Sequence, residues 1–211
     1  MTQLKKKIIY SGILTLKTGL HIGGTNAALN IGGPDKFVVR NPISNIPYIP
    51  GSSLKGKMRA LIELRHGCAA EKNGKTGPSN DGNSVSGKLF GVAGDANSSK
   101  PSRLIVRDAN LDVDSCDFSN TDLPFTESKT EVAIDRVTAK ANPRTFERVP
   151  AGAQFKLNMV LNIFEGEDEE ELKGILKQAM TLLEDDYLGG HGSRGYGQIV
   201  FESMKEEHKT Y

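Results

Sequence analysis

The stretch QFKLNMVLNIF, residues 154–164, has the clearest strand pattern in the chain, because apolar residues alternate with polar ones along it. Successive side chains of a strand point to opposite faces of the sheet, so every second residue shares a face. The apolar face is made by Phe155, Leu157, Met159, Leu161 and Ile163. We expect this face to line the core of a sheet around which the other elements are arranged.

A helix is predicted directly after this strand, over residues 168–187. Its first turn is acidic, which suits the positive end of a helix dipole. Apolar residues recur at helical spacing and form one broad face: Leu172, Ile175, Leu176, Ala179, Met180, Leu183 and Tyr187. The helix leads into GGHGSRGYGQ, residues 189–198, and QIVFE at 198–202 is predicted to be a closing strand.

The glycine loop, residues 189–198, holds five glycines in ten residues. Glycine adopts left-handed turns without steric cost, and successive backbone N–H groups in such turns form concave anion sites. A helix end and a tight turn into an edge strand would also use glycine, but one or two would suffice. Because Arg194 lies in the middle of the loop, we interpret it as a phosphate or nucleic-acid contact that includes Gly190, Gly192 and Gly195.

Bulk properties restrict the class of protein. The 211 residues suit one elaborated domain, and no run approaches the roughly 20 apolar residues of a membrane span. We expect no secretory signal in the first residues, because their apolar run is brief. Cys68 and Cys116 belong to no CxxC pair, which argues against a disulfide framework or a zinc site. We expect a cytoplasmic protein with no membrane partner.

Charge is distributed unevenly, although the net charge is only +1. Residues 1–65 contain ten Lys or Arg and two acidic residues, whereas the remainder contains 17 basic and 24 acidic ones. A basic half favours a polyanionic partner, and ordinary asymmetry of a soluble protein is the alternative.

A second helix is predicted from a Gly51–Ser53 cap to about Arg65. Lys55, Lys57 and Arg59 lie in its first two turns, where basic side chains oppose the helix dipole. These cations therefore favour an external anion near Ser53, with three solvated surface charges as the alternative. Further strands are predicted over residues 7–20, 37–39 and 103–107.

Two long segments interrupt this pattern. Residues 72–86 are rich in turn-forming residues, so we predict a mobile insertion over about 67–101. Residues 125–150 have five basic and four acidic side chains but few apolar ones, which predicts an extended hairpin within an insertion of about 120–150. The expected fold is a single α+β domain, residues 1–211. Its ferredoxin-like or RNA-recognition-type core would comprise residues 5–66, 102–112 and 151–204.

Common catalytic motifs are absent from the sequence. There is no Walker loop, no GxSxG and no HExxH, and the four histidines lack metal-ligand spacing. Any site must therefore be assembled in space from separate loops.

Four segments in this order resemble one family. They are TGLHIGG at 18–24, IPGSSLKGKMR at 49–59, the DRVTA, ANPR and ER pieces between about Thr130 and Arg148, and DYLGGHGSRGYGQ at 186–198. Together they resemble the RAMP-superfamily backbone subunit of type III-A (Csm) CRISPR effector complexes. The resemblance covers most of the chain outside residues 72–99.

The resemblance implies a defined activity. Copies would associate head to tail along a guide RNA, and a protruding thumb hairpin would splay the duplex of guide and target RNA at regular intervals. Each copy would cut the target RNA with a divalent metal, Mg²⁺ or Mn²⁺. Further expected partners are a large polymerase-like subunit, a small helical subunit and capping RAMP subunits.

The resemblance also implies the essential acid. The family carries it after the first strand in an I-G-x-x-D setting, which Ile31-Gly-Gly-Pro-Asp35 matches. Asp35 is the only acidic residue among the first 62, and Mg²⁺ is often held by one or two carboxylates plus phosphate oxygens. Asp35 is thus the expected catalytic and metal-binding residue. The alternative is a carboxylate that only caps a turn.

The remaining candidates are RNA-binding residues, which position RNA through its phosphates. They are His21, Ser53, Lys55, Lys57, Arg59, Arg136, Arg144, Gly190, Gly192, Arg194 and Gly195. The hairpin acids Glu127, Glu131 and Glu147 would pair with arginines or assist the metal, and Asp108 is one more acid. Two other functions stay open: a non-catalytic guide-binding scaffold, and a guide-RNA-processing endoribonuclease with His21 as general base.

Overall fold

A computed structural model describes residues 3–24, 34–72, 74–93 and 99–211. Within them the largest sheet is antiparallel and is built on β9 (Gln154–Phe164) and β1 (Leu4–Leu16), which pair along most of their lengths. Its strand order is β10-β1-β9-β6-β2, and β5 also pairs with β9. The shorter or outer strands are β2 (Tyr48–Ile49), β5 (Leu104–Val106), β6 (Ala109–Asp112) and β10 (Ile199–Thr210).

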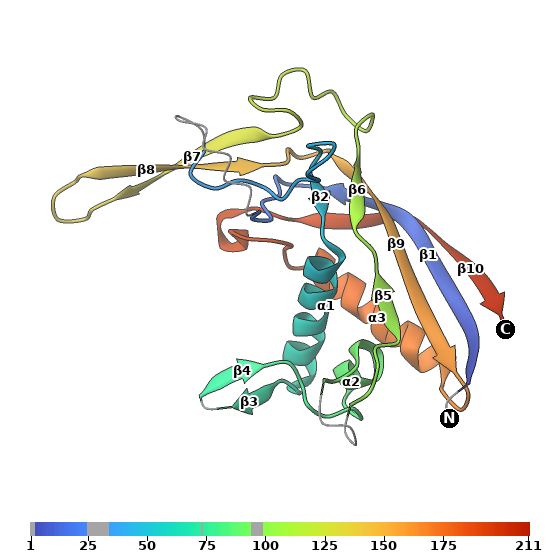
Figure 1. Ribbon diagram of the computed structural model, residues 1–211. Coiled ribbons are helices and arrows are strands. Elements are labelled where there is room, and N and C mark those ends of the chain that lie inside the picture. Colours follow the sequence, from blue (N-terminus) through green and yellow to red (C-terminus); the bar gives the residue numbers. More distant parts are fainter. Residues whose placement is uncertain (1–2, 25–33, 73, 94–98) are drawn as a thin grey trace.

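Two helices, α1 (Gly51–His66) and α3 (Glu169–Glu184), pack on one face of this sheet (Figure 1). The apolar face expected for β9 is buried against them, and Phe155, Met159 and Leu161 are fully enclosed. From the helices, Leu54 and Met58 of α1 and the apolar stripe of α3 complete the same core. The prediction of a mixed helix-and-sheet fold is therefore confirmed.

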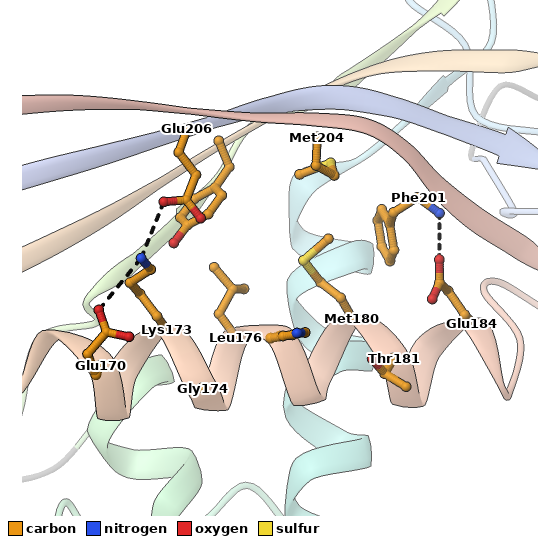
Figure 2. A pocket seen from close by; sticks show the side chains of 12 residues that line it. Glu170, Lys173, Gly174, Leu176, Met180, Thr181, Glu184, Phe201, Met204 and Glu206 are labelled. Carbon is orange, nitrogen blue, oxygen red and sulfur yellow. Dashed lines mark hydrogen bonds and ion pairs between the residues drawn. The ribbon is translucent and has the colours of Figure 1, made fainter.

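The last strand is longer than the sequence pattern predicts, because β10 pairs with β1 over nearly its whole length. Its contacts with α3 are shown in Figure 2. Glu184 accepts a hydrogen bond from the backbone N–H of Phe201 at 2.7 Å, and Lys173 lies 3.4 Å from Glu206. The polar outward half of β10 is thus held by backbone pairing and ion pairs, which periodicity does not reveal.

The start of α1 differs from the predicted serine cap. The N-cap is Pro50, and the first backbone N–H, that of Gly51, donates to the carboxylate of Asp108 at 2.7 Å. A Cβ at position 51 would lie 2.3 Å from the carbonyl oxygen of Val106, so only glycine fits. Asp108 therefore binds the start of α1, whereas the sequence analysis considered it as a further acid of the site.

The insertion after α1 is partly ordered into secondary structure. It contains β3 (Ala70–Lys72), β4 (Lys75–Gly77) and α2 (Val85–Phe90), so the prediction of one loop over residues 72–86 is wrong. The buried carboxylate of Glu63 accepts hydrogen bonds from Ser79 N–H at 2.9 Å and Ser86 Oγ at 3.1 Å. Because Glu63 lies in α1, the sequence of the insertion alone does not reveal these hydrogen bonds. The expected strand at 37–39 is also wrong, since Val38 makes only an isolated bridge.

A long hairpin, β7 (Glu127–Ile134) and β8 (Ala141–Arg148), extends away from the sheet (Figure 1). Its outer part is exposed, whereas Phe146 and Glu147 near its base are buried. The glycine loop, which includes the short helix η1 (Gly192–Arg194), follows α3. In the described residues, no helix is both long and apolar enough to cross a membrane.

Two glycines of this loop form a matched pair for a stability test. Gly195 and Gly197 both have positive φ, at 83° and 75°. A Cβ at Gly195 meets nothing within 4 Å, but one at Gly197 would lie 2.0 Å from the carbonyl oxygen of Leu188. In chemical denaturation we expect Gly195→Ala to cost about 1 kcal/mol, the left-handed penalty alone. Gly197→Ala should cost on the order of 3 kcal/mol, since backbone must move. Equal losses for the two variants would contradict this packing.

Candidate nucleic-acid interface

Asp35 is held at the base of the β7–β8 hairpin by β8. Its backbone N–H donates to the carbonyl oxygen of Thr145 at 2.9 Å, and its Oδ2 accepts from Thr145 N–H at 2.8 Å. One residue later, Lys36 O accepts from Glu147 N–H at 2.9 Å. The Asp35 side chain is exposed, and its Oδ1 has no hydrogen bond among the described residues. Residues 31–33 of the expected motif lie outside the described residues.

The carboxylate of Glu147 fixes the segment that follows Asp35. It is only 1% exposed, and it accepts hydrogen bonds from Val38 N–H at 2.8 Å and Thr126 Oγ1 at 2.7 Å. Its charge is balanced by the Arg40 guanidinium. Both oxygens are thus used inside the protein, and Glu147 is a positioning group that is not free to bind a metal.

His21 connects the end of β1 to both neighbouring segments. Its Nδ1 lies 2.6 Å from the carbonyl oxygen of Glu147, and because a carbonyl only accepts, Nδ1 carries the proton. Its own carbonyl accepts from Gly190 N–H at 2.9 Å. His21 is 6% exposed, so in this structure it joins β8 to the glycine loop.

The glycine loop packs against the hairpin base. The ring of His191 lies 4.5 Å from that of Phe146, and Arg194 Nη1 lies 2.6 Å from Glu131 Oε2. The close approach requires a small residue at position 192, where a Cβ would lie 2.0 Å from the Tyr187 ring. Thus the loop predicted from its glycines is brought beside Asp35 by tertiary packing.

Two adjoining hollows result, which we call the Asp35 hollow and the hairpin hollow. The Asp35 hollow has a volume of about 680 Å³ and is lined by His21, Asp35, Lys36, Gly190 and His191, among others. The hairpin hollow, of about 840 Å³, is lined by residues that include Lys36, Lys129, Glu131, Arg144, His191 and Arg194. Lys36 and His191 line both hollows, so the hollows adjoin, and we call the two together the groove. Its lining includes the basic side chains Lys36, Lys129, Arg144 and Arg194.

The wall of the groove contains perturbed groups. Burial and the neighbouring Glu131 raise the pKa of Tyr196 to about 12. Burial also raises the pKa of the Glu131 carboxyl, but the neighbouring Tyr196, Arg194 and Lys129 outweigh it and lower that pKa. Lys129 also lies over the Tyr196 ring, 4.5 Å from its centroid. The hairpin acids therefore pair with cations, as the sequence favoured, and Glu127 likewise pairs with Arg148 at 2.7 Å.

The cations of α1 lie elsewhere and already have partners. Lys57 is 2.9 Å from Asp186 and lies over the Tyr187 ring, and Arg59 is 2.8 Å from buried Glu63. Lys55 donates to Ser102 Oγ at 2.8 Å, and burial, followed by the nearby Arg59, lowers its pKa. None of these three lines either hollow.

Two further predicted residues lie outside the groove, and three residues that line it were not predicted. Ser53 is half-buried in the first turn of α1, and Arg136 is exposed at the hairpin tip. Lys36, Lys129 and His191 line the groove, but the sequence reading assigned them no role. Their common signal was proximity in sequence to residues that were chosen, since each flanks Asp35, the hairpin acids or the loop glycines.

The described residues offer limited metal-binding capacity. Among them, no cluster of three or more His, Cys, Asp or Glu side chains could hold an ion. Asp35 presents one carboxylate oxygen to the groove. A single protein carboxylate is compatible with Mg²⁺, which commonly keeps several waters and shares phosphate oxygens of a substrate.

The chain is an α+β domain with a groove that carries several basic side chains, and comparison with known proteins gives its class. The RAMP superfamily model matches residues 13–200, so the chain belongs to the RAMP superfamily. Within it the chain belongs to the Csm3 family, which confirms the resemblance seen in the sequence.

Individual relatives support this placement. The chain is 46% identical over 206 residues to "CRISPR system Cms endoribonuclease Csm3" of Methanocaldococcus jannaschii, covering 96% of this chain and 81% of the relative. It is 45% identical over 204 residues to the protein of the same name from Streptococcus thermophilus, covering 94% and 89%.

Two solved structures are similar in fold. The crystal structure of a Csm3–Csm4 subcomplex of the type III-A CRISPR-Cas interference complex matches with a TM-score of 0.63 and 36% identity, covering 99% of this chain and 82% of that chain. A chain of the type III-B Cmr-beta complex bound to cognate target RNA matches with a TM-score of 0.64. At 17% identity over 96% of this chain and 61% of that chain, the second match supports the fold alone.

The buried Glu147–Arg40 pair gives a stability prediction. Glu147→Gln should lower the free energy of unfolding by about 3 kcal/mol, because it leaves the Arg40 charge buried without its counter-ion. Glu127→Gln, at the more exposed pair with Arg148, should cost less than about 1 kcal/mol. Urea denaturation of both variants measures the difference. Losses of the same size would show that the Glu147 network does not anchor the Asp35 segment.

Proposed function

We propose that this chain is the backbone subunit of a type III-A CRISPR ribonucleoprotein that binds guide RNA and cleaves complementary target RNA. One observation carries the proposal: an exposed carboxylate, Asp35, is fixed at the base of a basic groove between the glycine loop and the hairpin. Basic groups attract the phosphates, and the fixed acid gives the groove a single chemical centre.

The names of the relatives support the reaction class, since they are endoribonucleases. The Csm3–Csm4 subcomplex supports association with further Csm subunits. We propose the same partners for this chain: further copies in a head-to-tail filament, guide RNA, target RNA, a capping RAMP subunit, a large polymerase-like subunit and a small helical subunit.

In this proposal Asp35 holds a divalent ion, Mg²⁺ or Mn²⁺, through its Oδ1. Oδ2 is already oriented by Thr145 N–H, which fixes the direction of the carboxylate. When bound, the ion would stabilise negative charge at the reacting phosphate. Lys36 and Arg144 would hold adjacent phosphates. Lys36 is positioned by its bridge to Phe146 of β8, and Arg144 by its place opposite Glu131 in the β7–β8 pairing.

The core would be of the ferredoxin-like type and the β7–β8 hairpin would act as the thumb. Its exposed tip, which includes Arg136, would enter the duplex. The hairpin extends away from the sheet (Figure 1). The α1 cations would contact guide RNA only by exchanging partners, for example Lys57 leaving Asp186 for a phosphate. Arg194 would likewise leave its ion pair with Glu131 to bind a phosphate.

Two alternatives are less well supported. A guide-processing enzyme with His21 as general base is disfavoured by the burial of His21, which is only 6% exposed. A purely structural scaffold would not need an exposed carboxylate that is held in one orientation, as that of Asp35 is. The following experiment separates both from the proposed ribonuclease.

Asp35→Ala should abolish target cleavage in the assembled complex at every regular position, while RNA binding and assembly persist, because only the ion-holding carboxylate is lost. The assay is gel analysis of labelled complementary RNA with Mg²⁺, with and without EDTA. Asp114→Ala changes an exposed aspartate outside the groove and should cleave normally.

Cleavage by the Asp35→Ala complex at the normal rate would overturn the assignment of Asp35. Normal cleavage in EDTA would overturn the metal requirement. If the unmodified complex binds target RNA without cutting it, the scaffold function is correct.

A further inference from the structure

His191 stands at the junction of the two hollows. It lines both, so one imidazole faces the groove on the Asp35 side and on the hairpin side. Its ring is held by three others: Phe146 at 4.5 Å, Tyr196 at 5.5 Å and His21 at 5.6 Å between centroids. A side chain packed this way has a fixed orientation, which catalysis requires and a surface contact does not.

The backbone at this position is specialised. His191 adopts φ of 63°, in the left-handed region that residues other than glycine seldom occupy. It is also the residue from which η1 begins, and Arg194 N–H donates to its carbonyl oxygen at 2.9 Å. The fold therefore tolerates a strained residue in order to keep a ring here among glycines.

The ring nitrogens of His191 remain open to the groove. No hydrogen bond to either is found among the described residues, and neither is one of the buried polar atoms that lack a partner. His21 is the opposite case, since it is buried and its Nδ1 is committed to Glu147. Of the two histidines, His191 is the one that lines both hollows and is less deeply buried.

The surroundings of this imidazole lower its pKa, which favours the neutral form. Burial is the main cause of its lowered pKa, and the nearby His21, Arg194 and Lys129 act in the same direction, whereas Glu131 opposes them. These groups come from the end of β1, from the glycine loop and from β7, the elements packed around the ring. A neutral imidazole has one nitrogen that accepts a proton.

We propose that His191 is the general base of target-RNA cleavage, an inference that rests on the proposed ribonuclease function. Its unprotonated nitrogen takes the proton from the ribose 2′-OH of the nucleotide at the groove. The 2′-oxygen then bonds to the adjacent phosphorus, and the bond from phosphorus to the 5′-oxygen breaks. The products are a 2′,3′-cyclic phosphate and a 5′-hydroxyl, whose proton comes from water. His191 returns its proton to solvent.

The division of labour follows from the geometry. Asp35 Oδ2 is engaged by Thr145 N–H, which leaves Oδ1 for the ion and no oxygen for proton transfer. Phe146, next to Thr145 on β8, carries the ring on which His191 packs. β8 thereby contacts both the ion-holding carboxylate and the base, and both residues line the Asp35 hollow.

The test uses the assembled complex under single-turnover conditions with Mg²⁺. His191→Gly suits the left-handed backbone and should lower the cleavage rate by about 100-fold or more, while the affinity for target RNA stays within about threefold. Added imidazole should restore much of that rate, because it supplies the missing nitrogen. His66→Ala, at an exposed histidine outside the groove, is the control and should cleave normally.

A second variant tests the proposal if the His191→Gly protein does not assemble into the complex. His191→Phe keeps a ring against Phe146 but lacks a nitrogen, so it should be equally slow and should not respond to imidazole. A rate within about threefold of the unmodified complex for either variant would overturn the proposal. So would a slow His191→Gly complex that imidazole does not restore. Binding of target RNA without cleavage by the unmodified complex would instead refute the underlying ribonuclease function, so the two failures are distinguishable.

Discussion

The buried carboxylate of Glu147 is the interaction on which the groove depends. The carboxylate balances the charge of Arg40 and accepts hydrogen bonds from Val38 N–H and Thr126 Oγ1. The backbone of Glu147 forms hydrogen bonds with Lys36 and His21. A buried charge is tolerated only when its oxygens are satisfied, so these partners are held in one arrangement. The hairpin base, the Asp35 segment and the end of β1 are therefore fixed relative to one another. His21 extends the same connection to Gly190 and the glycine loop.

Local patterns predicted the elements whose signal is periodic. The alternation at residues 154–164 coincides with β9, and the predicted helix over 168–187 contains α3. Local patterns gave wrong predictions where a polar group distant in sequence determines the structure. Glu63 organises part of the insertion after α1, and Asp108 binds the first amide of that helix, neither of which periodicity reveals.

The site was predictable to a similar extent and for similar reasons. The glycine loop and Asp35 were found because unusual composition and a family motif mark them. The cations of α1 were chosen for their unfavourable place on the helix dipole, but Asp186, Glu63 and Ser102 already satisfy them. Lys36, Lys129 and His191 gain their place in the groove only through packing of the loop on the hairpin, which depends on contacts across more than 40 residues of sequence.

The central claim is that RNA and a divalent ion meet at Asp35 in the groove beside β8. Replacement of the ion by Fe²⁺ in the assembled complex, with peroxide and ascorbate, tests it directly, because hydroxyl radicals cut the polypeptide next to the bound iron. Mass spectrometry of the fragments should show cuts near residues 35 and 145, which Asp35→Ala removes. Cuts confined to other segments, or the same cuts in Asp35→Ala, would contradict the account.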